Sequence, residues 1–297
     1  MTVAETDLPG KIEIRPMTLA EVELAIEWAT LEGWNPGLAD AIPFRAADPD
    51  GFLMAFLDGE PAASIAVVAS GEHHGFLGFY IVRPELRGRG IGWALWQAGI
   101  ARLGSRSIGL DGVVDQQANY ARSGFVLQHR NIRHMGPVPQ PSDAPETVRA
   151  VNAEDLPALA AFDAAHSGCD RSAFLQAWLS TPGHVARIAT GSDDGDDGAG
   201  GGIRGYGVVR PARTGFKIGP LFARTPEVAS DLFDALVRTV PPGESIILDV
   251  PEPNAAAIAL AERHGLKPVF ETARMVKGEA PSLPLGEIFG VTSFELG

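Results

Sequence analysis

The 297-residue chain contains a single cysteine, Cys169. One cysteine excludes an internal disulfide and cannot supply the cluster of thiolates that holds a structural zinc ion. A nucleophilic role would require a base placed beside the thiol, because the thiolate is the reactive form. We therefore interpret Cys169 as a structural or incidental thiol.

Basic residues are also few. The chain has 24 lysines and arginines against 37 aspartates and glutamates, which gives a formal net charge of −13. This balance argues against a general binder of nucleic acid or of anionic membranes, because both need a basic surface. An acidic surface keeps a protein soluble and is compatible with cationic small-molecule substrates.

Long apolar runs are absent as well. No run approaches the ~20 residues that cross a bilayer. The N-terminal residues Met1–Asp7 lack the basic and apolar regions of a signal peptide. We therefore expect a cytoplasmic protein that binds no membrane, and the sequence leaves its oligomeric state open.

Clusters of metal ligands are missing too. His73 and His74 are adjacent, but neighbours in a strand or turn point apart, and no third ligand is spaced to join them. The acidic segment Gly191–Gly202 has no closing glutamate of a calcium loop, and we interpret it as a flexible surface extension. We expect no bound metal.

The most informative stretch that is present runs from Phe76 to Trp96. Its residues Phe79–Val82 are apolar and β-prone, and Pro84 ends the strand. The loop Arg87–Gly92 then opens a helix. A glycine-rich loop before a helix N-terminus offers free backbone N–H groups and a favourable dipole to an anion, and two arginines add positive charge suited to phosphate.

Two common nucleotide motifs do not fit this loop. A dinucleotide fingerprint needs Gly-x-Gly-x-x-Gly after a first parallel strand, whereas the glycines here are Gly88, Gly90 and Gly92, and several antiparallel strands precede them. A P-loop would require Gly-Lys-Ser/Thr, which is absent.

The order of elements repeats along the chain. Residues 147–156 echo residues 13–22, with a short strand followed by a polar helix cap, and Gly124 and Gly265 close equivalent helices. We interpret this as a diverged internal duplication. The expected organisation is an extension (1–10), a first domain (11–138), a linker (139–146), a second domain (147–278) and a tail (279–297) that packs as an extra strand.

Downstream of the loop lies Tyr120-x-x-x-Gly124-Phe125, after a strand and a short helix. Strand, proline, Arg87-x-x-Gly90-x-Gly92, helix and this tyrosine together resemble the GNAT family of acyl-CoA-dependent N-acetyltransferases. The resemblance covers the first half, and the second half looks like the same fold. It implies an α/β protein with two GNAT-like domains, each a mixed, mostly antiparallel sheet flanked by helices.

The resemblance also implies an acetyl-CoA site. The loop amides would bind the pyrophosphate, with glycine at three positions because a Cβ would hold the phosphate off the backbone. The key strand would bulge away from Ser107–Val113, and the freed amides of Ile81 and Val82 would bind the pantetheine and the thioester carbonyl. The loop residues in question are Arg87, Gly88, Arg89, Gly90, Ile91 and Gly92.

Tyr120 matches the general acid of that family. A phenol with a pKa near ~10 stays protonated at neutral pH and can donate to a thiolate whose own pKa is ~8.5. The simpler interpretation of Tyr120 is a packing residue at a helix end. No general base stands out: the acids, histidines and tyrosine nearby have no decisive spacing, namely Glu32, Glu72, His73, His74 and Tyr80.

The second half departs from the pattern. Its loop, Arg224–Asp231, has no glycine and two acids where phosphate would lie, and Ala261 takes the place of the tyrosine. We therefore expect one active site, in the first half, which transfers an acetyl group from acetyl-CoA to a primary amine of a small metabolite by direct attack. A non-catalytic acyl-CoA sensor is the alternative. The acceptor and the acyl-chain preference cannot be read.

Overall fold

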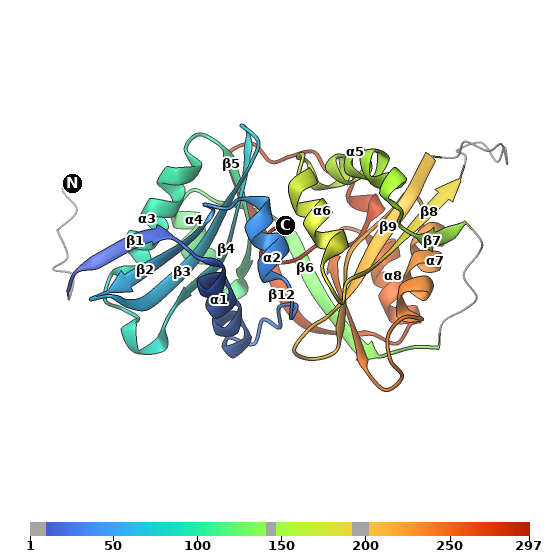
Figure 1. Cartoon of the computed structure of the whole chain (residues 1–297), viewed down its shortest axis with the longest axis horizontal. Coiled ribbons are helices and arrows are strands. Elements are labelled where there is room, and N and C mark those ends of the chain that lie inside the picture. The colour runs from blue at the N-terminus through green and yellow to red at the C-terminus, as the bar shows by residue number, and fades with distance from the viewer. Residues whose placement is uncertain (1–9, 141–146, 192–201) are drawn as a thin grey trace.

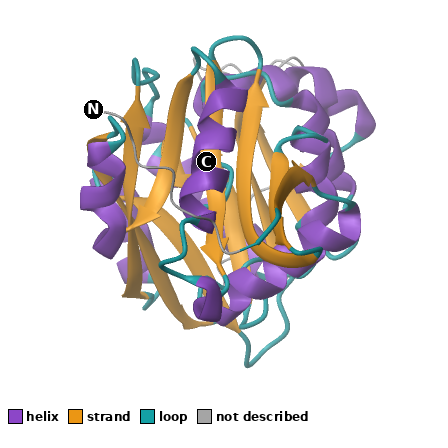
Figure 2. Cartoon of the chain, turned by 90° about the vertical axis from the view of Figure 1, so that its left-hand side faces the viewer, coloured by secondary structure: helices purple, strands orange, loops and turns teal. Residues whose placement is uncertain are grey.

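The computed structural model describes residues 10–140, 147–191 and 202–297. These residues form one 13-stranded sheet that runs through both halves of the chain (Figure 1). Helices cover both faces of the sheet (Figure 2). The expected mixed, mostly antiparallel α/β architecture is confirmed. The extension before Gly10, linker residues 141–146 and most of the acidic segment lie outside the described residues.

Both halves use the same order of elements. The first half contains β1 (Ile12–Pro16), α1 (Leu19–Leu31), α2 (Ala41–Ala47), β2 (Phe52–Leu57), β3 (Glu60–Ser70), β4 (His74–Val82), α3 (Ile91–Leu103), β5 (Ser107–Val113), α4 (Gln117–Arg122) and β6 (Val126–Pro137). The second contains β7 (Val148–Ala150), α5 (Leu156–Ser167), α6 (Ser172–Ser180), β8 (Val185–Gly191), β9 (Gly202–Pro211), β10 (Phe216–Ala223), α7 (Pro226–Val237), β11 (Ser245–Pro251), α8 (Ala255–Arg263) and β12 (Lys267–Lys277). A last short strand, β13 (Ile288–Gly290), follows. No helix in the described part of the chain is long and apolar enough to cross a membrane.

A capping box precedes the first helix of each half. Thr18 and Glu21 form a capping box at α1, as their spacing predicts, and Asn152 and Asp155 form one before α5. In both halves an arginine three residues before the cap pairs with the acidic residue of the box. This repetition at matched positions supports an internal duplication.

The two halves exchange their last strands. The strand order is β4-β5-β12-β6-β11-β10, so β12 lies beside β5 of the first half, and β6 lies beside β11 of the second. The sheet therefore joins the two predicted repeats, 11–138 and 147–278, through crossed strands. Residues of β12 are brought to the first repeat by this exchange.

A shared core also joins the repeats. Helix α2 of the first repeat packs against α6 of the second, and the rings of Phe44 and Trp178 stack there at 6.0 Å. Below them, Arg210 on β9 forms a fully buried ion pair with Asp40 at 2.9 Å. Burying a charged pair requires close geometry on both sides, so these contacts hold the repeats in one relative position.

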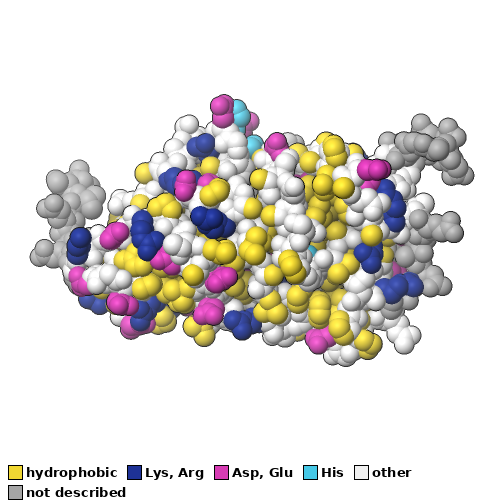
Figure 3. Space-filling view, in the orientation of Figure 1, with side chains coloured by type: hydrophobic (Ala, Val, Ile, Leu, Met, Phe, Trp, Pro, Cys, Tyr) yellow, Lys and Arg dark blue, Asp and Glu magenta, His cyan; other side chains and the backbone are white. Residues whose placement is uncertain are grey.

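The C-terminal tail is part of the fold. β13 pairs with β10, and Val291–Glu295 are buried. On the face shown in Figure 3, lysines and arginines are interspersed with acidic side chains and form no broad basic area.

Candidate active site

A gap opens in the sheet between β4 and β5. These parallel strands pair from His74 with Ser107 as far as Leu77 with Leu110, and there the pairing ends. Just beyond that point Phe79 has a φ of 45°, and the register between β3 and β4 shifts. This is a bulge, which bends β4 away from its neighbour. Both the bulge and the parting from Ser107–Val113 agree with the expectation from the resemblance.

The bulge decides which β4 amides face the gap. Arg83 N–H donates to the Ala62 carbonyl of β3, so by antiparallel alternation Ile81 N–H also faces β3 and Val82 N–H faces the opposite side. The Phe79 carbonyl accepts a bond from Ser64 Oγ at 2.9 Å. Because N–H and C=O of one trans peptide point in opposite directions, Tyr80 N–H is turned towards the gap. The free amides are therefore those of Tyr80 and Val82, while that of Ile81 is directed at β3.

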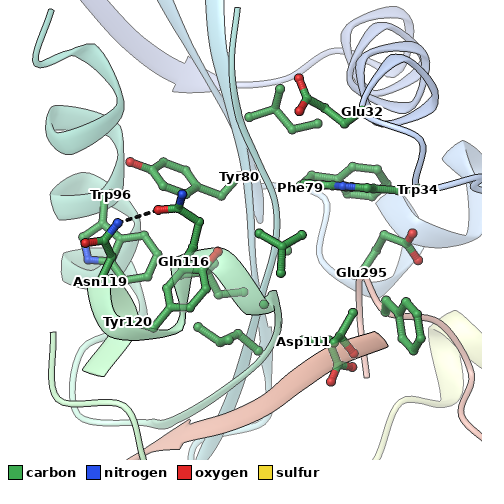
Figure 4. A pocket seen from close by; sticks show the side chains of 18 of the residues that line it. Glu32, Trp34, Phe79, Tyr80, Trp96, Asp111, Gln116, Asn119, Tyr120 and Glu295 are labelled. Atoms are coloured by element: carbon green, nitrogen blue, oxygen red, sulfur yellow. Dashed lines mark hydrogen bonds between the residues drawn. The ribbon is translucent and has the colours of Figure 1, made fainter. Parts of the chain in front are cut away.

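A cavity of about 710 Å³ passes through this gap. Figure 4 shows Tyr80, Trp96 and Tyr120 on one side of the gap, and Trp34 and Glu295 on the other. The first side is built by β4, α3 and α4, and the second by the segment after α1, by β12 and by the tail. The further side chains on the second side are Glu32, Phe270, Thr272 and Phe294.

The predicted phosphate loop lies before α3. Gly88 and Gly90 have φ values of 76° and 82°, a region that glycine adopts without strain, and Gly90 is the N-cap of α3 with no side-chain cap. The first N–H groups of the helix are thus left for another acceptor. Gly92 has a different reason: a Cβ there would lie 2.8 Å from the Tyr80 hydroxyl and 2.7 Å from a Val82 methyl. The resemblance implies phosphate approach at all three glycines, and the structure adds this packing reason for Gly92.

The two loop arginines differ in their contacts. Arg87 donates through Nε to the Val82 carbonyl at 2.9 Å and pairs with Glu32, so it ties the loop to β4 and α1. Arg89 is exposed and makes no hydrogen bond or ion pair with any described residue. Arg89 is therefore available to a bound anion, and Ile91 begins the helix with its side chain buried.

Tyr120 is buried on α4 beside the gap. Its ring stacks on Trp96 at 5.8 Å, and Trp96 in turn packs against Tyr80 at 5.2 Å. The lack of a side chain at Gly112 makes room for the Tyr120 ring. Burial, with a smaller contribution from Tyr80, raises the pKa of Tyr120 to about 12. The phenol is therefore protonated at neutral pH.

The other sequence candidates for a base are not in position. Glu72 and His73 are exposed in the turn before β4, and His74 starts the paired end of that strand, away from the gap. Burial raises the pKa of Tyr80 to about 12, which makes it a poor base. Glu32 does line the cavity, but Arg87 holds it. No three His, Cys, Asp or Glu side chains of the described ranges lie close enough to hold a metal ion.

Four cavity residues were not singled out from the sequence: Trp34, Phe270, Phe294 and Glu295. They come from three distant segments that carry no motif. The segment Glu32–Asp50, the second domain and the tail were all expected to contribute to the acceptor pocket, but no motif singled out these four side chains.

The equivalent gap in the second repeat is filled. β10 and β11 pair in parallel only from Phe216 with Ile246 to Ile218 with Leu248, which reproduces the parting in the first repeat. Here β13 enters and pairs with β10, and Val291 N–H donates to the Asp249 carbonyl at 2.9 Å. The tail thus occupies the place that remains open in the first repeat.

Comparison with known proteins agrees with this geometry. A model described as the acetyltransferase (GNAT) family matches residues 19–125, and one described as an acetyltransferase (GNAT) domain matches residues 159–290. A curated relative, holothin acyltransferase from Pseudoalteromonas sp. (strain SANK 73390), is 31% identical over 283 residues, or 95% of this chain and 94% of the relative. The chain belongs to the GNAT family. The expected tandem GNAT organisation and acyltransferase class are confirmed.

Solved GNAT structures share the fold. A Pyrococcus horikoshii protein described as an acetyltransferase superposes with a TM-score of 0.80 at 22% identity, covering 100% of this chain and 99% of that one. A tandem GNAT protein from the clavulanic acid biosynthesis pathway has a TM-score of 0.62 at 16% identity, covering 91% of this chain and 100% of that one. GNAT enzymes take the acyl group from acyl-CoA, so the gap and its loop belong to an acyl-CoA-dependent transferase.

Proposed function

We propose that this GNAT protein transfers an acetyl group from acetyl-CoA to a primary amine of a small metabolite, by direct attack at a single site in the first repeat. The open gap between β4 and β5 carries the proposal, because two backbone amides face a cavity that also holds a buried tyrosine. The second repeat acts as a structural element that closes the acceptor side.

The residues of the first repeat fit coenzyme A. The uncapped N–H groups at Gly90–Gly92 and the free side chain of Arg89 suit the pyrophosphate. The pantetheine arm fits the gap, where Val82 N–H is available. We assign the thioester carbonyl to Tyr80 N–H, since a donor already oriented by the bulge stabilises charge that develops on that oxygen, by a few kcal/mol.

Tyr120 is the proposed general acid. As the amine attacks the thioester carbon, the C–N bond forms, the C–S bond breaks and the departing thiolate needs a proton. A phenol whose pKa is about 12 is protonated at neutral pH, and its buried ring is fixed by Trp96. Fixing a donor in this way is worth about 10²–10⁴-fold in rate.

The acceptor side favours a small, partly apolar amine. Its walls include Trp34, Phe270 and Phe294, and the tail and β12 close it on the side of the second repeat. Aromatic walls with few polar groups are typical of sites that bury small ligands. The relative's name denotes acylation of holothin, which makes holothin one acceptor to test.

The test is release of coenzyme A thiol from acetyl-CoA against a panel of small amines that includes holothin, tryptamine and phenethylamine. Longer acyl-CoA donors are run beside acetyl-CoA, and the product mass identifies the acyl group. We expect amine-dependent thiol release with acetyl-CoA. Binding of acetyl-CoA without turnover of any amine would instead favour the acyl-CoA sensor.

A further inference from the structure

The C-terminal tail connects the filled gap of the second repeat to the cavity of the first. After β13 the chain passes Gly219, where a Cβ would lie 2.6 Å from the carbonyl oxygens of Val291 and Thr292. Thr292 and Ser293 are buried, and Phe294 and Glu295 then line the cavity. The tail is thus held along its whole length before it reaches the site.

Two contacts fix the end of the tail. The backbone of Glu295 lies against Gly78 of β4, which has no side chain to keep it away. The guanidinium of Arg133 lies 4.7 Å from the ring centre of Phe294. Arg133 is itself held by Asp249 through two hydrogen bonds of 2.7 and 2.8 Å. The position of residue 295 is therefore set by its backbone contact with Gly78 and by the cation–π contact of the preceding Phe294 with Arg133.

The carboxylate of Glu295 is buried, and both of its oxygens lack a hydrogen-bond partner among the described residues. Glu295 is 3% exposed, and neither of its oxygens makes a hydrogen bond or an ion pair with another described residue. The other two acids that line the cavity are both paired, Glu32 with Arg87 and Asp111 with Arg274. An unpaired carboxylate removed from water is costly unless a cation joins it, which points to a ligand.

We infer that Glu295 binds the acceptor amine as its ammonium ion and removes a proton from it, as the base of the first-repeat site. This rests on the proposed function, which left the base unassigned. Glu295 and Tyr120 lie on opposite sides of the gap (Figure 4), so the base and the proposed acid lie on opposite sides of the place assigned to the thioester.

The protons balance in this scheme. A primary amine with a pKa near ~10 arrives as an ammonium ion at neutral pH. It gives one proton to Glu295, which passes it to solvent. The neutral nitrogen attacks, Tyr120 protonates the thiolate, and the second proton that the nitrogen loses returns to Tyr120 through water. The products are the amide, coenzyme A thiol and one released proton.

Other charged groups face Glu295 from the neighbouring strands. Arg133 on β6 and Lys217 on β10 both sense its charge, and Asp249 on β11 lies between them. Burial, with repulsion from Arg133, lowers the pKa of Lys217 to about 8. Lys217 is therefore a second group that titrates near neutral pH, and Lys217→Arg is needed as a control in any pH profile.

The test compares wild type, Glu295→Gln and Glu295→Asp, with the exposed Glu279→Gln of the same C-terminal segment as matched control. With an amine that the wild type acetylates, Glu295→Gln should lower kcat/KM by about 100-fold at pH 7, while the KM for acetyl-CoA holds. The deficit should shrink by about tenfold per pH unit up to pH 9, because free amine then replaces the base. Glu295→Asp should recover part of the rate, and Glu279→Gln should match the wild type.

If Glu295 had a purely structural role, Glu295→Gln would have a lower melting temperature and a loss of kcat/KM that does not change with pH. That result would overturn the inference. So would a kcat/KM within threefold of wild type. Because glutamine removes an unpaired buried charge without changing shape, we expect Glu295→Gln to melt no lower than wild type.

A binding measurement separates this inference from the proposed function. Benzylammonium is titrated calorimetrically into each variant without any acyl donor. We expect Glu295→Gln to bind at least tenfold more weakly than wild type and Glu279→Gln to bind equally well. If no amine is acetylated but benzylammonium binding still depends on Glu295, the acetyltransferase proposal is rejected and the ammonium site is kept. Binding that is equal in all variants, or missing in all, would reject the site.

Discussion

The Cβ that Gly78 lacks would overlap the carbonyl oxygen of Glu295. Gly78 lies on β4, one residue before the bulge, and Glu295 lies at the end of the tail that has crossed the second repeat. The contact joins the strand that opens the cofactor gap to the segment that closes the acceptor side. It is backbone against backbone, so neither partner can move aside by a change of side-chain rotamer.

Gly78→Ala should therefore displace the tail. Overpacking of this kind costs about 1–3 kcal/mol, and we expect a lower melting temperature together with a lower kcat/KM for the amine. Gly286→Ala is the matched control, since a Cβ there has no atom within 4 Å. Scanning calorimetry and steady-state kinetics check both variants. Equal stability of Gly78→Ala and wild type would show that the tail does not rest on β4.

Tyr120→Phe should separate chemistry from cofactor binding. The ring remains stacked on Trp96 and only the hydroxyl is lost, so acetyl transfer should fall at least ~100-fold while acetyl-CoA affinity is unchanged. Thiol release and calorimetric titration measure the two quantities. Turnover equal to that of wild type would remove Tyr120 from the mechanism.

The sequence predicted the parts of this site that are local. The Thr18–Glu21 capping box, the loop that opens α3 and the Tyr120-x-x-x-Gly124 spacing each involve residues that are neighbours in the chain. Interactions between neighbouring residues determine the geometry of caps and turns, so a single sequence is enough to predict them. The fold class followed from the same motifs.

The exchange of β6 and β12 could not be predicted from the sequence. Alternation along a strand specifies which face is buried, but it does not specify which neighbour the strand pairs with. The presence of Phe270 of β12 in the cavity therefore could not be predicted either. Glu295 was missed for a related reason, because its position depends on a β10–β11 gap that only the folded second repeat provides. The sequence also does not specify the register of β3 with β4, which directs the Ile81 amide at β3.

The buried pair of Arg133 and Asp249 should matter for stability. Asp249→Asn leaves Arg133 and Lys217 without their counter-ion, and breaking such a pair costs about 3–5 kcal/mol. Urea unfolding at pH 7 measures this loss. Glu85→Gln, which removes an exposed partner of Arg83, should leave the free energy of unfolding unchanged. Equal effects of the two variants would contradict a stabilising role for the buried pair.

The same pair predicts how stability depends on pH. Burial alone would raise the pKa of Asp249, but Arg133 and Lys217 overcome it and hold the pKa at about 2. A folded pKa below the unfolded value of ~3.9 means that the contribution is present above that value and is lost as pH falls from about 5 through 2. The free energy of unfolding should decline in this window for wild type, and less so for Asp249→Asn. Parallel declines would assign the acid sensitivity to other groups.

Acetyl-CoA should bind once per chain. The second gap is occupied by β13, and the loop before α7 offers Glu227 where the first repeat has Arg89 and glycines. Calorimetric titration gives the stoichiometry, and Arg89→Glu should weaken the binding because it reverses the charge beside the helix N-terminus. Two equivalents of acetyl-CoA per chain would show that the second repeat keeps a site.

We propose that acetyl transfer takes place at a single site, in the first repeat. The most direct measurement quantifies coenzyme A thiol and N-acetylated amine in one reaction, for wild type and for Gly88→Val, which puts a β-branched residue at a φ of 76° in the phosphate loop. We expect equal amounts of the two products from wild type and a large loss of both in the variant. Thiol release without acetylated amine, or undiminished transfer by Gly88→Val, would contradict it.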